Sequence, residues 1–222
     1  MLYALGRPVA FAALVVAFLL GLLLRAVAIR LTARSLGLTG RRDPITPRPR
    51  EDIDPFGAVA AAIGGMGWGK TISVDEVPRS RGRLRAAMVF IAGPLTCIVV
   101  AQMIFAGYVL AYPDNLLLYL SPSDVLLGID LPAGQQVLLS LAVGLLSFGL
   151  LALVPIPPLD GFGILYSALR RPGPSMQWMR LWFEEKNVGV VVLLALCLFP
   201  FGAPYLLYLL DFLGVLFLRL WA

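Results

Sequence analysis

Residues 64–71 have the types and spacing of a phosphate-binding loop, so the first chemistry to consider is nucleotide binding. The segment reads Gly-Gly-Met-Gly-Trp-Gly-Lys-Thr. A functional loop of this kind follows a strand and begins a helix whose amino end binds phosphate. Here residues 71–77 alternate between apolar and polar like a strand, and Pro78 ends them. We therefore interpret the segment as a glycine-rich turn at a membrane surface and expect no nucleotide.

Two charged residues, Arg25 and Asp160, lie beside strongly apolar segments. Arg25 follows the uninterrupted apolar run 9–24, and Asp160 follows the proline-rich residues 155–158. A charge at membrane depth costs from about 2.5 kcal/mol upward, so such residues usually pair or reach water. Asp160 could also cap or bond the backbone near the prolines, and Arg25 could extend along its long stem to the membrane interface.

The elements that must position these residues are membrane-spanning helices. The chain of 222 residues is 59% hydrophobic and only 14% charged, with a mean hydropathy of +0.87, whereas a soluble domain has about 25% charged residues. We predict an α-helical polytopic membrane protein with a single membrane domain over residues 1–222. Four full spans are expected at about 8–29, 87–111, 136–156 and 188–209, because each is long and apolar enough to cross a bilayer.

Shorter elements complete the predicted fold. The apolar pieces 116–120 and 125–129 are expected to lie along the membrane interface. Residues 71–77 predict a short β segment, and prolines near residue 200 predict a separate short helix at 210–221. A cleaved signal peptide is the alternative to the first span, because Ala26-Val27-Ala28 resembles a cleavage site.

The basic residues are clustered by loop. Eleven of the 18 Lys and Arg residues fall between positions 30 and 85, and none falls between 86 and 169. Basic loops usually remain in the cytoplasm. The pattern predicts a protein of a bacterial-type cytoplasmic membrane, with loops 30–85 and 160–187 inside, 112–136 outside and the N-terminus outside. It also argues against a continuous basic surface for nucleic acid.

Four phrases in fixed order resemble the site-2 protease family of intramembrane zinc metalloproteases. They are Asp54-Pro55-Phe56-Gly57, Gly67-Trp68-Gly69-Lys70, Ala92-Gly93-Pro94, and the run from Leu153 to Gly161 that contains Pro155-Ile156-Pro157-Pro158-Leu159-Asp160. The resemblance extends from about residue 22 to residue 198. It implies a site-2 protease-like core.

The resemblance also implies where a catalytic centre would lie. In the family, two histidines four residues apart share one helix face shortly before an Ala-Arg-x-x-Gly sequence, and a glutamate between them acts as the general base. The aspartate of the last phrase is the third zinc ligand. Counting back from Ala33 and Gly37, the ligand positions are Arg25 and Ile29, and the base position is Ala26.

The sequence departs from the family at these positions. It contains no histidine, so no shift of the alignment restores the motif. Cys97 and Ala152 stand where the family usually has asparagines, and only Asp160 remains. We therefore expect no catalytic residues, no metal and no cofactor. Because the family brings positions 25 and 160 together on one metal, we hypothesise that the Arg25 guanidinium replaces it and pairs with Asp160.

Three functions are compatible with this sequence. The first is an inactive protease homologue that binds or holds membrane-protein partners, with Gly67, Trp68, Gly69 and Lys70 as possible partner-binding residues because they could add a strand to an extended peptide. The second is a stably bound accessory subunit of a larger membrane complex. The third is an active hydrolase with an unrecognised site, although Thr96, Ser140 and Ser147 have no histidine or membrane lysine to activate them. Membrane lipids and an unidentified membrane protein are the expected partners.

Overall fold

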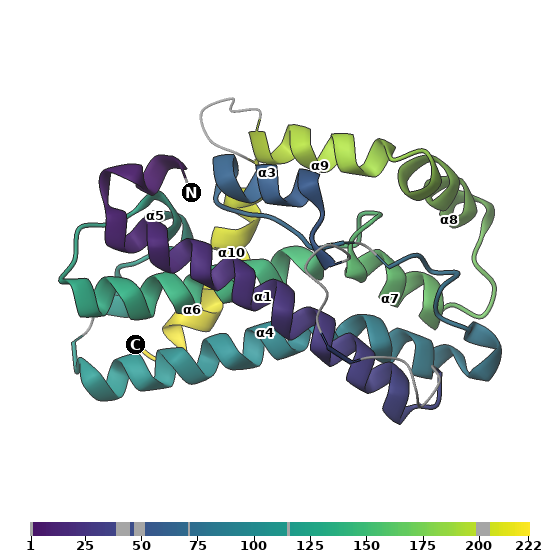
Figure 1. The fold of residues 1–222 in the computed structure, drawn as a ribbon, viewed down its shortest axis with the longest axis horizontal. Coiled ribbons are helices and arrows are strands. Elements are labelled where there is room, and N and C mark those ends of the chain that lie inside the picture. Colours follow the sequence, from purple (N-terminus) through teal and green to yellow (C-terminus); the bar gives the residue numbers. More distant parts are fainter. Residues whose placement is uncertain (1, 39–44, 47–51, 71, 115, 199–204) are drawn as a thin grey trace.

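Three long helices form the centre of the molecule. The computed structural model describes residues 2–38, 45–46, 52–70, 72–114, 116–198 and 205–222. Helices α1 (Pro8–Ser35), α4 (Arg83–Ala111) and α6 (Ala133–Ala152) pack against one another along the long axis (Figure 1). All three are long and apolar enough to cross a membrane. The chain is therefore an α-helical membrane protein.

Glycine and proline determine how these helices meet and where they end. Gly93 on α4 faces α1, and a Cβ there would lie 2.7 Å from Cγ of Arg25, so only glycine allows this approach. Helix α6 ends at Ala152, because the prolines that follow cannot continue it. The chain then turns and begins α7 (Asp160–Ala168), which packs against α4.

Short helices cover one end of the bundle. They are η1 (Leu2–Gly6), η3 (Leu116–Leu118) and α5 (Pro122–Leu127). The last begins with a capping box in which Ser121 and Asp124 bond each other's backbone amides. Helix η3 lies within the predicted apolar piece 116–120, and α5 overlaps the predicted piece 125–129 only at residues 125–127.

The predicted fourth span at 188–209 is divided between two shorter helices. Helix α9 (Val188–Leu198) has 11 residues, which at 1.5 Å per residue gives about 16 Å, half of a bilayer core of about 30 Å. Helix α10 (Tyr205–Arg219) begins earlier than the short helix predicted at 210–221. Residues 199–204, between the two helices, lie outside the described part of the chain.

The predicted β segment is not a strand where the structure describes it. Residues 72–77 form a turn, and in the described ranges the β pairing is one isolated antiparallel bridge between Ile53 and Gly69. The reason is local. The Ser73 hydroxyl accepts a hydrogen bond from the Asp75 amide, and Glu76 accepts one from the Ser73 amide. Such side-chain bonds compete with strand pairing.

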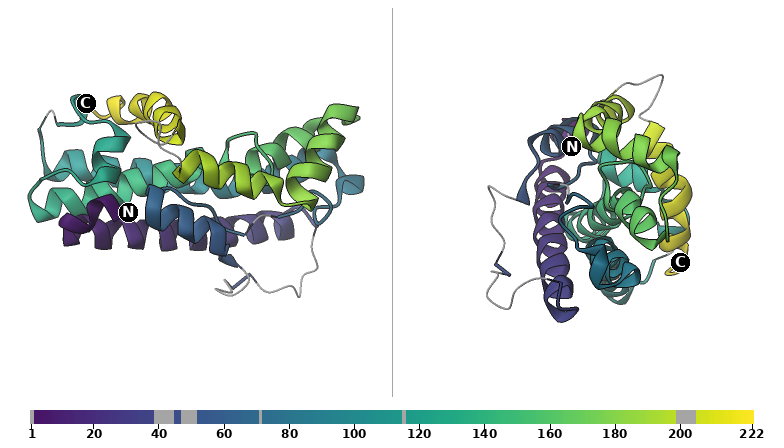
Figure 2. Two further views of the ribbon diagram at one scale, coloured as in Figure 1. Left: turned by 90° about the horizontal axis from the view of Figure 1, so that it is seen from above. Right: turned by 90° about the vertical axis from the view of Figure 1, so that its right-hand side faces the viewer.

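Parts of the two predicted cytoplasmic loops meet where α4 begins and α7 ends, at the right-hand end of the left view in Figure 2. Helix α3 (Pro55–Gly64), inside the predicted loop 30–85, instead contacts η1. Arg79 donates a hydrogen bond to the Leu169 carbonyl at 2.7 Å, and Arg83 donates one to the Ala168 carbonyl at 3.2 Å. At the same end, π-helical η4 (Arg180–Glu185) follows α8 (Pro174–Met179). These contacting parts of the two basic loops can therefore face one side of a membrane.

Candidate functional site

A guanidinium–carboxylate pair joins α1 to the start of α7. Arg25 Nε donates to Asp160 Oδ2 at 2.6 Å, and Arg25 Nη2 donates to Asp160 Oδ1 at 2.5 Å. Two parallel bonds of this kind give both strength and a fixed orientation. The structure thus brings together the two residues that the sequence analysis hypothesised to pair.

Arg25 also holds the loop before residue 71. Its Nη1 donates to the Lys70 carbonyl at 2.9 Å. The Lys70 amide in turn donates to the Asp52 carbonyl at 2.9 Å. Gly69 lies close against α1, because a Cβ there would be 2.6 Å from a methyl group of Leu22 and 3.5 Å from Arg25 Nη1. Each of the three nitrogens of the Arg25 guanidinium therefore has an acceptor.

The pair is buried. Arg25 is 7% exposed and Asp160 is 3% exposed. Beside them is a cavity of about 10 Å³, enough for about one water molecule. It is lined by Arg25, Trp68, Gly69, Phe148, Ala152, Pro158, Leu159 and Asp160. Arg25, Ala152 and Asp160, three of the positions that the resemblance associates with a catalytic centre, therefore line one small cavity.

The other predicted positions are filled by apolar contacts. Ile29 is 4% exposed and packs in a cluster with Val89 and Phe90 of α4. Ala26 is also buried. The Cys97 thiol lies 3.6 Å from the Gly21 carbonyl, within hydrogen-bond range for sulfur. These positions contribute packing at the junction of α1, α4 and α6.

The residues present do not fit a zinc ion. Among the described residues, no group of three His, Cys, Asp or Glu side chains could hold a metal, and catalytic zinc usually takes three protein ligands. Asp160 is the one carboxylate among the described residues that line the cavity, and each of its two oxygens accepts a hydrogen bond from Arg25. A cation of the protein itself stands against the carboxylate.

Of the four possible partner-binding residues, Gly67, Trp68 and Gly69 are buried, and Lys70 is exposed. The Trp68 side chain is buried, and its indole Nε1 donates to Asp54 Oδ2 at 2.7 Å. Asp54 Oδ1 also accepts from the Phe56 amide at 3.0 Å and so caps α3 (Pro55–Gly64). A Cβ on Gly57 would lie 2.0 Å from the Trp68 carbonyl oxygen. Two of the four phrases therefore make one packed unit.

Sequence reasoning missed two contacts near the site. One is the Lys70 carbonyl, because a backbone acceptor leaves no signal in residue types. The other is the pair in which Arg30 Nη2 and Nη1 donate to Asp52 at 2.5 and 3.1 Å. The sequence does contain a signal for this pair, because Arg30 and Asp52 carry opposite charges. Arg30 lies five residues after Arg25, and Asp52 lies just before the phrase that begins at Asp54. Together the two arginines attach the 52–70 segment to α1.

Comparisons with known proteins agree with the resemblance. No protein-family model matches the chain, and no solved structure matches it. A protein of Bacillus subtilis named "Putative zinc metalloprotease YwhC" is 28% identical over 159 residues, which cover 72% of this chain and 67% of the relative. The similarity supports a site-2 protease-like relationship for this α-helical membrane protein.

Proposed function

We propose that this chain is a catalytically inactive site-2 protease-like membrane protein that serves as a binding or scaffold subunit for membrane-protein partners. The observation that best supports this proposal is the bidentate contact between Arg25 and Asp160. In the site-2 proteases that this chain resembles, the residues at these positions hold zinc, and the zinc activates the water that hydrolyses the peptide bond. Here an arginine takes the place of the metal at the one carboxylate that the motif retains.

The hydroxyl groups near the site do not replace the lost chemistry. Thr96 Oγ1 donates to the Ala92 carbonyl of its own helix at 2.7 Å. Ser147 Oγ is buried and has no hydrogen-bond partner among the described residues. A serine or threonine nucleophile needs an adjacent base, and the chain has no histidine. These groups support an inactive protein rather than a hydrolase with another site.

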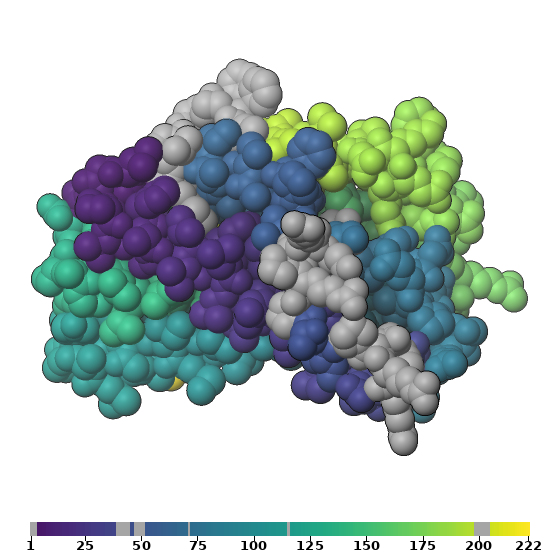
Figure 3. All heavy atoms as spheres, in the orientation of Figure 1, coloured from purple at the N-terminus to yellow at the C-terminus, as the bar shows by residue number. Residues whose placement is uncertain are grey.

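The closed packing around Trp68 favours a second form of the same function, a stably bound accessory subunit without a client-binding cleft. Gly69 already pairs with Ile53, and the cavity at the site holds only about 10 Å³. An extended client peptide would need a free backbone edge. On the face shown in Figure 3, atoms of α1 and α3 meet directly.

Purification from native membranes in a mild detergent tests both forms. A stoichiometric complex of fixed composition supports the accessory subunit, whereas varied single-span proteins support client binding. A chain recovered alone, with no co-purifying membrane protein after cross-linking in the membrane, contradicts both. The matched catalytic test is cleavage of single-span substrates in proteoliposomes. Cleavage that is lost in Asp160→Asn and retained in Asp130→Asn, a change at an exposed carboxylate far from the site, contradicts inactivity.

A further inference from the structure

The segment Pro174–Lys186, here called the tryptophan segment, has two chemically different faces. It comprises α8 and η4 and ends just before the apolar helix α9. In Figure 1 α8 is seen nearly along its axis, whereas α1, α4 and α6 run across the page. The segment therefore lies crosswise to the helices that cross the membrane.

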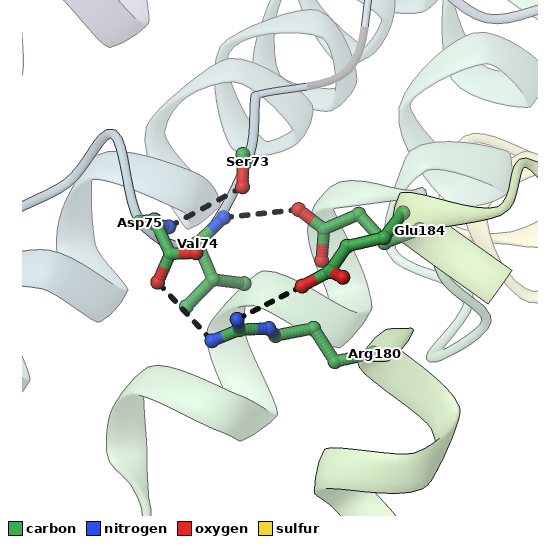
Figure 4. A network of polar contacts seen from close by, with 6 residues as sticks. Ser73, Val74, Asp75, Arg180 and Glu184 are labelled. Atoms are coloured by element: carbon green, nitrogen blue, oxygen red, sulfur yellow. Dashed lines mark hydrogen bonds and ion pairs between the residues drawn. The ribbon is translucent and has the colours of Figure 1, made fainter. Parts of the chain in front are cut away.

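The inner face is held by polar contacts to the turn at residues 72–77 (Figure 4). Glu184 Oε1 accepts the Val74 amide at 3.2 Å. Arg180 donates to Asp75 Oδ1 and to Glu185 Oε1, each at 3.1 Å. Met176 and Met179 add apolar contacts to the cluster of Val74, Phe162 and Tyr166. These contacts attach the inner face to the rest of the protein.

The outer face carries aromatic and basic side chains in a row. Trp178 and Trp182 are 55% and 40% exposed, and their ring centroids lie 5.9 Å apart. Lys186 Nζ stands 4.1 Å from the centre of the Trp182 ring. These two contacts place the three side chains on one side of the segment. Leu181, at 43% exposed, adds apolar area beside them.

The charge of this region is positive. Residues 170–187 contain four basic and two acidic residues. Arg180 is engaged by acidic partners, and Arg170 and Arg171 are exposed on the loop before α8. Tryptophan and lysine side chains are the usual residues at membrane–water interfaces, and basic residues near the surface attract anionic lipids.

We infer that the tryptophan segment lies in the lipid headgroup layer, with Trp178 and Trp182 at the boundary to the acyl chains and with Arg170, Arg171 and Lys186 binding anionic phospholipid headgroups. An amphipathic helix with this composition lies in the plane of the interface. The polar contacts of the inner face fix its depth relative to the turn at 72–77. The site is separate from the Arg25–Asp160 pair and does not rest on the proposed function.

Fluorescence quenching tests this inference with the full chain in lipid vesicles. The probes are phospholipids brominated either near the headgroup or deep in the acyl chain, in neutral phosphatidylcholine vesicles and in vesicles that also contain phosphatidylglycerol. We expect bromines near the headgroup to quench the tryptophan fluorescence more than bromines deep in the acyl chains. In the vesicles that contain phosphatidylglycerol, we expect the tryptophan emission to shift further to the blue and to be quenched more strongly. The quenched fraction should disappear in the Trp178→Phe/Trp182→Phe variant. Trp221→Phe is the matched control, because Trp221 already donates to Gln102 and lies elsewhere.

The triple variant Arg170→Gln/Arg171→Gln/Lys186→Gln separates charge from aromatic insertion. It should keep the shallow quenching in neutral vesicles and lose the additional effect of phosphatidylglycerol. Equal quenching of the unmodified chain in both vesicle types refutes anionic headgroup binding. Water-like emission that neither bromine position quenches refutes the interfacial location, and it instead indicates a soluble surface open to a protein partner.

Discussion

Arg25 and Asp160 are 135 positions apart in the chain, yet the guanidinium of one meets the carboxylate of the other through two hydrogen bonds. The first lies on a spanning helix, and the second begins α7 after the proline-rich turn. Both residues are buried, so neither charge is hydrated by bulk water. Removing only one member of such a buried pair strongly destabilises a protein, because the remaining buried charge then has no partner.

The first prediction concerns the coupling within this pair. Arg25→Met and Asp160→Leu should each lower the free energy of unfolding by about 3–5 kcal/mol, because each leaves one buried charge. The double variant should be more stable than either single variant. Arg25→Lys should be intermediate, because an ammonium keeps the charge but not the two-pronged geometry. Chemical denaturation in detergent micelles measures all four, and independent, additive effects would show that the two residues do not interact energetically.

The second prediction concerns zinc. The purified chain should hold no stoichiometric zinc and cleave no peptide, because one carboxylate cannot replace about three protein ligands. The variant Arg25→His/Ala26→Glu/Ile29→His places two imidazoles four residues apart on the same helix face as the original side chains. It should bind about one zinc per chain.

Elemental analysis after gel filtration measures the metal content of both proteins. Adding Asp160→Asn to the triple variant should remove the bound zinc and serves as its control. About one zinc per chain in the unaltered protein, lost on Asp160→Asn alone, would overturn the inactive-homologue proposal.

A third prediction concerns orientation. Single cysteines at Arg81 and Asp124, both exposed, should be labelled from opposite sides of the membrane, with position 81 on the cytoplasmic side. Cys97 and Cys197 are buried and should be replaced by alanine to remove background. Labelling intact cells with an impermeant maleimide, before and after permeabilisation, distinguishes the sides. Both positions reacting from one side would contradict the predicted topology.

A fourth prediction concerns the junction of Trp68 with Asp54. Trp68→Phe keeps an aromatic ring but removes the donor to a part-buried carboxylate, so it should lower the free energy of unfolding by about 1–3 kcal/mol. Trp178→Phe changes a tryptophan of α8 that is 55% exposed and should cost less. Denaturation curves of the two variants give the comparison. Equal costs would mean that the Trp68 bond contributes nothing specific to the site.

The long helices could be predicted from the sequence because their signal is composition over many residues. The predicted spans at 8–29, 87–111 and 136–156 overlap α1, α4 and α6 within a few residues at most ends. The largest difference is at the end of α1, which continues to Ser35 through a polar stretch. Charged residues in the sequence indicate where the chain leaves the membrane, but a helix can continue beyond that point.

Shorter elements depend on contacts that sequence pattern does not contain. Residues 72–77 alternate like a strand, but Ser73 and Glu76 bond nearby amides, and Glu184, more than 100 residues away, takes the Val74 amide. Likewise, the apolar residues after position 188 did not predict where α9 would end and α10 would begin. At the site, the side-chain partners of Arg25 followed from charge and family position, whereas the Lys70 carbonyl did not.

In the proposed function, an arginine stands where a metalloprotease holds its metal, and this changes what the fold needs from the cell. A structural centre built from histidines and zinc makes folding depend on metal supply, and ligand deprotonation makes its affinity depend on pH. The Arg25 guanidinium stays charged far above neutral pH and comes with the chain itself. The junction of α1, α7 and the Lys70 loop can therefore form as soon as these segments meet in the bilayer, and neither zinc starvation nor a chelator should weaken it.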